Sequence, residues 1–338
     1  MTPNPAAHAP AAARSTNSGH ATTPVALHRY AVAVAVCTGL LIFAGGLVTS
    51  TGSGLAVPDW PLSYGQIMPP MVGNVRFEHG HRMVASTVGA LTVILAIWLA
   101  KREPRAWVRR LGWTALGAVI LQGLLGGLTV KMLLPAPVSV AHGTLGQTFF
   151  CLVSAIALFT SAGWTRPVTP REDAGSGPSL RTLALCTTGA VFVQLILGAT
   201  MRHREAGLAI PDFPLAFGKV IPPLTNGNVA IHFAHRVWAV VVAALAFVTA
   251  WRTLRHHGEV REIARPARLL AALVFAQLAL GATTIWTHKA AVPTTFHVLN
   301  GALVLVTSLV LTLQVHRGVA ARSRAATFGT LATPRTVS

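Results

Sequence analysis

The sequence predicts an all-α integral membrane protein with eight transmembrane helices. Charged residues make up only 11% of the 338 residues, where a soluble domain has roughly 25%. Apolar residues make up 52%, and they gather in eight stretches long enough to cross ~30 Å of hydrocarbon. The predicted spans are 29–51, 79–100, 108–130, 138–162, 181–202, 230–251, 267–288 and 292–316.

The second half of the sequence repeats the first. Gly54–Leu62 reappears as Gly207–Leu215 with only aliphatic or aromatic exchanges. The register then persists to the end of both halves; it pairs His81 with His235, Arg82 with Arg236 and His142 with His297. Each unit has an even number of spans, so both units share one orientation. We therefore expect two four-helix bundles related by a pseudo-two-fold axis along the membrane normal.

Composition shifts set the domain boundaries. The first 28 residues are rich in Ala, Pro, Thr and Ser, which is typical of a disordered tail. A Pro- and Gly-containing segment separates the fourth and fifth spans and is the expected linker. The predicted organisation is a tail at 1–28, a bundle at 29–162, a linker at 163–180, a bundle at 181–316 and a tail at 317–338.

The distribution of the net charge of +18 along the sequence predicts how the chain is oriented in the membrane. Such an excess can indicate a nucleic-acid binder, but 19 of the 27 Lys and Arg residues lie in the tails and in the loops on one side. By the positive-inside rule, both termini are cytoplasmic. We expect a multi-pass protein of a bacterial cytoplasmic membrane, in contact with the lipid bilayer and not with nucleic acid.

Four histidines occupy equivalent positions in the two halves. Each lies near the beginning of an even-numbered span, at its predicted extracytoplasmic end. Ligating groups inside a membrane are costly unless they are paired, so they are candidates for function. An isolated histidine would more often be a satisfied core residue. Two histidines at one depth on neighbouring helices suit axial ligation of a haem, here noncovalent because no Cys-x-x-Cys-His occurs. The predicted pairs are His81 with His142 and His235 with His297.

The two halves differ beside the first histidine of each pair. Glu78 lies three residues before His81, whereas His232 lies three residues before His235. A carboxylate one turn from a haem ligand can act as a base or stabilise developing positive charge. This asymmetry favours chemistry in the first bundle and a structural or electron-relaying haem in the second. A plain helix N-terminal carboxylate is the alternative, and too few carboxylates are present for a di-metal site.

These residues together resemble the heme A synthase family. The resemblance rests on Glu78-x-x-His81-Arg82, on the three other histidines and on the repeated Pro-Asp-aromatic-Pro loops, and it spans roughly residues 29–316. It implies oxidation of a methyl group of haem O to a formyl group, giving haem A for a terminal oxidase. It further implies that His81 and His142 flank the substrate haem O, that His235 and His297 bind a resident haem b, and that Glu78 is catalytic.

The resemblance has further implications. Arg82 and Arg236 would pair with haem propionates, since guanidinium binds carboxylate bidentately. An electron acceptor and the enzyme that produces haem O would be partners, and a homo-oligomer is compatible with this interpretation. Part of the family carries a cysteine pair in the first outer loop, but residues 52–77 contain none. Mechanisms that use such a disulfide are therefore in doubt here, and the roles of His79 and His232 stay open.

Several features leave alternatives. Cys37, Cys151 and Cys186 lie in apolar spans, and no disulfide is expected. A bis-histidine di-haem b cytochrome acting only in electron transfer would use the same four ligands without needing Glu78. A transporter would need a polar path at mid-membrane. Gln122, Gln194 and Gln277 precede Gly-containing stretches, where a role in helix packing is expected.

Overall fold

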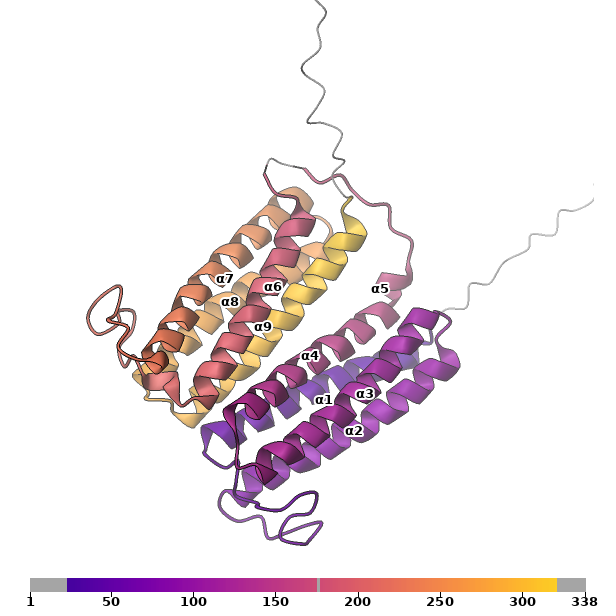
Figure 1. The fold of residues 1–338 in the computed structure, drawn as a ribbon. Helices are drawn as coiled ribbons and strands as arrows, with labels where there is room; N and C mark the ends of the chain where they lie inside the picture. The colour runs from indigo at the N-terminus through magenta and orange to yellow at the C-terminus, as the bar shows by residue number, and fades with distance from the viewer. Residues whose placement is uncertain (1–22, 175–176, 321–338) are drawn as a thin grey trace, which may run out of the picture.

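The computed structural model describes residues 23–174 and 177–320, and Figure 1 shows that this part is built of helices. Eight helices in it are long and apolar enough to cross a membrane, which confirms the predicted spans. The tails predicted at 1–28 and 317–338 lie mostly outside the described residues. The long helices are α1 (Val25–Ser50), α2 (Val75–Arg102), α3 (Ala106–Lys131), α4 (Ala136–Thr160), α6 (Leu180–His203), α7 (Gly227–His257), α8 (Arg261–Trp286) and α9 (Ala291–Gly318).

Several helices extend beyond the apolar stretches that predicted them. Helix α1 begins at Val25, directly after Pro24 in an extended conformation. Helix α7 begins at Gly227, where the Asn226 side chain accepts hydrogen bonds from the next two free backbone N–H groups. Hydropathy marks the part of a helix that lies in hydrocarbon, whereas capping residues decide where the backbone leaves the helix. The short elements α5 (Ala162–Thr165) and η1 (Ala206–Leu208) lie in the connections.

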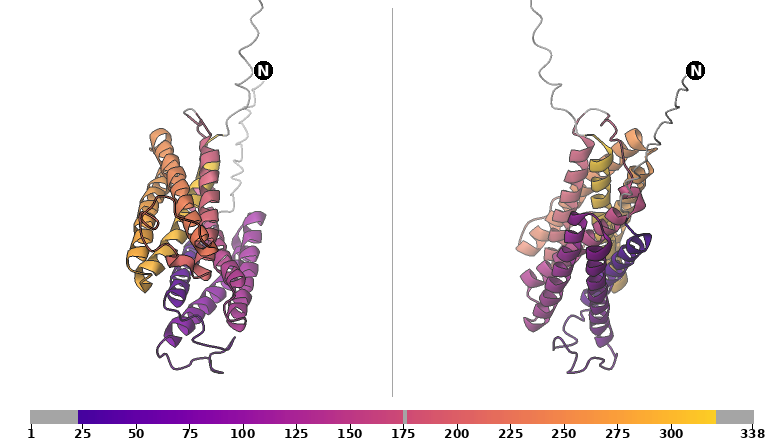
Figure 2. Two further views of the ribbon diagram at one scale, coloured as in Figure 1. Left: turned by 60° about the vertical axis from the view of Figure 1, so that its left-hand side comes forward. Right: turned by 90° about the vertical axis from the view of Figure 1, so that its right-hand side faces the viewer.

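The long helices form two groups that lie side by side (Figures 1 and 2). Helices α1–α4 pack around one hydrophobic core and α6–α9 around a second. The largest buried side chains include Leu95 and Ile156 in the first core and Leu270 and Leu311 in the second. Helices α1 and α4 meet α6 and α9 where the groups join. The two-fold axis stays a prediction.

The segment predicted as a linker forms hydrogen bonds and an ion pair with the ends of helices α7 and α9. The Arg171 N–H donates to the Gly318 carbonyl (3.0 Å), and the Arg171 carbonyl accepts from Ala320 N–H (2.7 Å). The Arg252 guanidinium of α7 donates to the Pro178 carbonyl and pairs with the Asp173 carboxylate at 3.2 Å. The side chains of this last pair are 7% and 1% exposed, so the ion pair is buried.

Replacing Arg252 by Gln is expected to destabilise the fold by about 3 kcal/mol, because it leaves a buried carboxylate without its guanidinium partner. The matched control is Arg171→Gln, which breaks the Arg171–Glu259 pair, with side chains 54% and 64% exposed. Exposed pairs are worth less than about 1 kcal/mol. Thermal unfolding in detergent, followed by circular dichroism, measures both; equal losses would contradict the burial argument.

Candidate functional site

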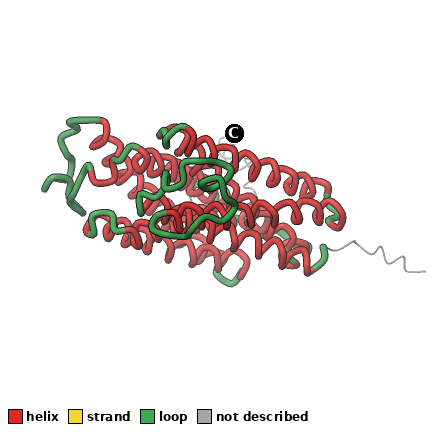
Figure 3. Tube along the Cα trace, turned by 90° about the horizontal axis from the view of Figure 1, so that it is seen from below, coloured by secondary structure: helices red, strands yellow, loops and turns green. Residues whose placement is uncertain are grey.

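Two long loops, residues 51–74 and 204–226, cover the ends of the two helix groups; Figure 3 views the molecule from this side. In the first loop the Asp59 carboxylate accepts from the N–H groups of Tyr64 (2.7 Å) and Gly65 (2.8 Å). Both donors have positive φ, which places successive N–H groups on one side of the chain. Asp212 holds Phe217 and Gly218 in the same way. The repeated Pro-Asp-aromatic-Pro motif is therefore a carboxylate-centred turn.

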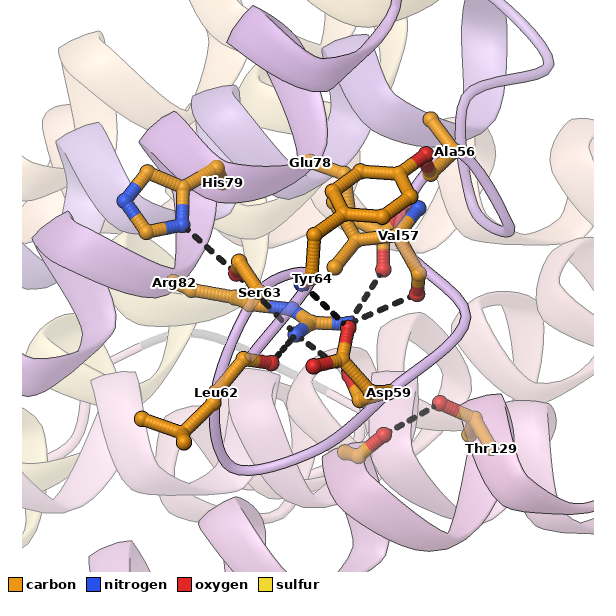
Figure 4. A network of polar contacts seen from close by, with 11 residues as sticks. Ala56, Val57, Asp59, Leu62, Ser63, Tyr64, Glu78, His79, Arg82 and Thr129 are labelled. Carbon is orange, nitrogen blue, oxygen red and sulfur yellow. Dashed lines mark hydrogen bonds and ion pairs between the residues drawn. The ribbon is translucent and has the colours of Figure 1, made fainter. Parts of the chain in front are cut away.

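Arg82 joins the first loop to helix α2 (Figure 4). Its Nη1 donates to the Asp59 carbonyl (2.7 Å) and the Leu62 carbonyl (3.0 Å), and its Nη2 donates to the Val57 carbonyl (3.1 Å). Nη2 also lies 2.6 Å from Glu78 Oε1 in an ion pair one helical turn long. Both terminal nitrogens of Arg82 are therefore engaged in the structure, and its pairing with a haem propionate stays a prediction.

Glu78 is buried, 3% exposed, beneath this loop. Its Oε1 accepts from Arg82, and its Oε2 accepts from the Val57 N–H at 2.8 Å. Both carboxylate oxygens thus face fixed donors, one of them charged. The arrangement holds a negative charge in a defined place one helical turn from His81.

The second half builds the same contacts around an imidazole. His232 is 2% exposed; its Nδ1 faces the Ile210 N–H and its Nε2 faces Arg236 Nε, each at 3.2 Å. Arg236 also donates to the Leu215 and Ile210 carbonyls of the second loop. A neutral imidazole has one acceptor nitrogen, so it cannot accept both hydrogen bonds as a carboxylate does. His232 therefore replaces the shape of Glu78 but not its negative charge.

Each of the four predicted ligands packs against a glycine of the preceding helix. A Cβ atom built on Gly45, Gly126, Gly198 or Gly281 would lie 3.0, 3.1, 3.0 or 3.3 Å from Cε1 of the facing histidine. The rings that they face are His81, His142, His235 and His297, in that order. The sequence predicts a helix-packing role for Gly126, Gly198 and Gly281, but it does not reveal that each faces a histidine ring. Two other glycines, Gly146 and Gly301, lie against glutamine amides.

Three of the histidines accept a hydrogen bond from a glutamine side chain at their backbone carbonyl. Nε2 of Gln122 donates to the backbone carbonyl of His142 at 3.0 Å and lies 3.5 Å from its ring Nε2. Gln194 with His235 and Gln277 with His297 repeat this contact. The equivalent position facing His81 is Leu41. The glutamines thus do more than pack helices, because they hold the turn that carries the histidine.

The structure places the four histidines in the predicted pairs. His81 lies close enough to His142, and His235 to His297, for the imidazoles to interact electrostatically. Nδ1 of all four rings is buried with no hydrogen-bond partner among the described residues. A buried ring nitrogen without a partner costs free energy unless a ligand engages it. The site is thus two pairs of imidazoles, with a fixed carboxylate beside one pair.

Two further polar residues distinguish the first site, and sequence reasoning left their role open. His79 Nδ1 lies 2.8 Å from the Ser63 hydroxyl of the loop, and both side chains are buried. The repeat replaces this polar pair by Phe233 and Ala216, which pack in a small apolar cluster. Comparing the two halves position by position is the signal that could have found the pair.

Trp60 covers the first site by lying on a glycine. A Cβ on Gly127 of α3 would lie 2.6 Å from the Trp60 ring. In the second half the smaller Phe213 stands at this position of the loop, and Ala282 replaces the glycine. The Trp60 ring can therefore pack in this position only if residue 127 is a glycine. The first loop contacts α3 as well as α2.

The first loop is expected to open in acid. Hydrogen bonds from the Gly65 and Tyr64 N–H groups hold the pKa of the Asp59 carboxyl below its usual value. Protection of these two amides from hydrogen exchange should therefore be complete above about pH 4, the ordinary pKa range of Asp, and be lost as the pH falls through the lower folded value. Asp59→Asn keeps an acceptor without a titrating carboxyl, so its amides should show no such pH dependence; the same profile in both proteins would refute the assignment.

Comparison with known proteins identifies the family. The family model described as cytochrome oxidase assembly protein, COX15-CtaA, matches residues 28–76 and 74–310. A heme A synthase of Symbiobacterium thermophilum is 33% identical over 72% of this chain and 80% of its own length. That of Caulobacter vibrioides is 32% identical over 84% and 93%, and that of Halalkalibacterium halodurans 31% over 79% and 90%. The chain belongs to the COX15-CtaA family of cytochrome oxidase assembly proteins, the family of the heme A synthases.

Proposed function

We propose that this chain is a heme A synthase, which oxidises a methyl group of haem O to a formyl group and so provides haem A for a terminal oxidase. The observation that carries the proposal is the pairing of four membrane histidines with one buried carboxylate. Glu78 stands beside the first pair, and His232 stands at the equivalent place beside the second. Relatives of similar length that carry the name heme A synthase support the same reaction.

The residues present fit a haem in both halves. Each histidine ring has a buried nitrogen without a hydrogen-bond partner among the described residues, and a glycine at its edge where a Cβ would make a tight contact. We propose that His81 and His142 hold the substrate haem O and that His235 and His297 hold a resident haem b. A bound haem b would supply one-electron redox chemistry at its iron.

Glu78 contributes a fixed negative charge beside the substrate pair. Arg82 and the Val57 N–H hold its two oxygens, so the carboxylate needs no reorganisation when positive charge develops nearby. The loop above it, pinned by Asp59 and Trp60, limits the access of water to this charge. His232 carries no negative charge, so the chemistry belongs to the first half.

The chain is proposed to lie in a bacterial cytoplasmic membrane with both termini in the cytoplasm. The eight apolar helices support a multi-pass protein, and the excess of Lys and Arg in alternate loops supports the orientation. Helix α1 begins, and α9 ends, at the side opposite the two long loops (Figure 1). Both histidine pairs then lie near the outer face, and haem O and the electron acceptor must reach them there.

Glu78→Gln is expected to lower haem A formation at least about 100-fold, because it removes the charge beside the substrate while keeping the side chain's shape. Membranes that contain haem O and the variant are extracted, and the haems are separated by chromatography. The control is Glu205→Gln, which removes an outer-side carboxylate that is 85% exposed and pairs with Lys289. Haem A at near wild-type levels in Glu78→Gln would overturn the assignment.

A second variant separates the charge from the support of the loop. Glu78→His copies the arrangement at His232, so it should keep the loop protected from proteolysis and still abolish haem A formation. Wild-type protein that holds haem b at both pairs and never yields haem A would instead indicate the electron-transfer cytochrome. The relatives do not favour that alternative.

Gly198→Ala is expected to lower the haem b content of the purified protein several-fold, since its Cβ would lie 3.0 Å from His235 Cε1 and a ligated ring cannot turn away. Gly189→Ala is the control on the same helix, where an added Cβ meets nothing within 4 Å. The control should bind haem normally. The haem-to-protein ratio from absorbance spectra checks both; equal ratios would show that the glycine does not constrain the ligand.

A further inference from the structure

Arg202, at the outer end of α6, reaches across from the second half of the molecule to the first. Its Nη2 donates to the Gly46 carbonyl (3.1 Å) and to the Ser50 hydroxyl (2.9 Å), both on α1. The Thr295 hydroxyl of α9 donates to the same Ser50 oxygen at 3.1 Å. Three helices from both halves therefore meet at this guanidinium.

The positive charge of Arg202 has no ion-pair partner among the described residues. Its hydrogen-bond acceptors on α1 are a carbonyl and a hydroxyl, both neutral. The Glu205 carboxylate interacts with Arg202 electrostatically without forming an ion pair, and it pairs with Lys289 at 3.6 Å. Arg82 pairs with Glu78, so the two arginines differ in this respect. A half-buried guanidinium whose bonded partners are neutral keeps donors that can bind an anion.

The charge lies beside the candidate haem ligands. Arg202 is close enough to His297 to interact with it electrostatically, and the neighbouring His203 is close enough to His142. On α1, the residue before the Gly46 acceptor is Gly45, on which the His81 ring rests. The repeat places Thr49 where Arg202 stands, so the charge occurs once, at the junction of the two pairs.

We infer that Arg202 binds a carboxylate of the haem held by His235 and His297, and that it ties this haem to the turn of α1 that carries His81. The inference rests on the proposed haem b site. A guanidinium offers a planar fork that suits a carboxylate, and only Nη2 of Arg202 is committed to α1. A phospholipid phosphate has the same ligand chemistry, and the experiment distinguishes it.

The sign of the electrostatic effect follows from charge alone. A fixed cation near the iron disfavours the ferric form, which carries one more positive charge than the ferrous form. Arg202 therefore raises the reduction potential of the haem beside it. Removing the charge stabilises the oxidised form and lowers the potential.

The test compares Arg202→Gln, Arg202→Lys and Arg204→Gln in full-length protein purified with its haem. Arg202→Gln should lower the equilibrium constant for reduction about tenfold, equal to about 59 mV for one electron. Arg202→Lys keeps the charge and should restore most of the potential, and Arg204→Gln should leave it unchanged. Redox titration followed by haem absorbance gives all three values.

Loading haem-free protein with haem b or with its dimethyl ester identifies the anion. The ester lacks carboxylates, so Arg202→Gln should weaken binding of haem b but not binding of the ester. Equal effects on both would show that Arg202 does not bind a haem carboxylate and would overturn the inference. So would an unchanged potential in Arg202→Gln with a lowered melting temperature, the result expected of a purely structural tie.

These outcomes are distinct from failure of the proposed function. If wild-type protein binds no haem b, or if His297→Ala retains it, the haem b site itself is wrong. If haem b binds through His297 and its reduction potential is the same in Arg202→Gln as in wild type, only the inference about Arg202 fails.

Discussion

The fold depends on the contact between an imidazole edge and a glycine. Four times, a helix that begins at the end of the molecule with the two long loops carries a histidine, and the helix before it has a glycine that faces the histidine ring. Any side chain at the glycine would enter the space of the ring, so each contact sets how closely two helices approach. The positions of the four histidines, and of any ligand between them, follow from these four contacts.

Around this common frame the two halves have diverged in a consistent direction. The first half has a carboxylate at Glu78 and a polar pair in Ser63 and His79, where the second has an imidazole and an apolar pair. Each second-half exchange removes charge or polarity beneath the loop. Because the backbone contacts to the loops are retained, the exchanges change the chemistry of the site without changing its support.

Sequence reasoning predicted the spans and the histidine pairs because both leave local signals. Twenty apolar residues in a row are visible in any window, and the repeat gives each histidine a counterpart. The ion pair of Glu78 with Arg82 was also within reach, since residues four apart meet on a helix. The contacts of the histidine rings with Gly45 and Gly198 could not be predicted, because they join residues more than 30 positions apart whose alignment depends on how the helices pack. The contacts of Arg202 were out of reach for the same reason, because its acceptors on α1 lie over 150 residues away.

The glutamine contacts differ between the two halves in a way that fits the proposed substrate haem and resident haem. Gln194 and Gln277 hold both histidine turns of the second pair, whereas Gln122 alone serves the first pair, because Leu41 faces His81. Each contact adds a hydrogen bond worth about 1 kcal/mol to the position of a ligand. If the second pair holds a resident haem, as proposed, that haem gains from two restrained histidines. The proposed substrate haem must leave after it has reacted, and a pair with one less restrained histidine opposes its release less.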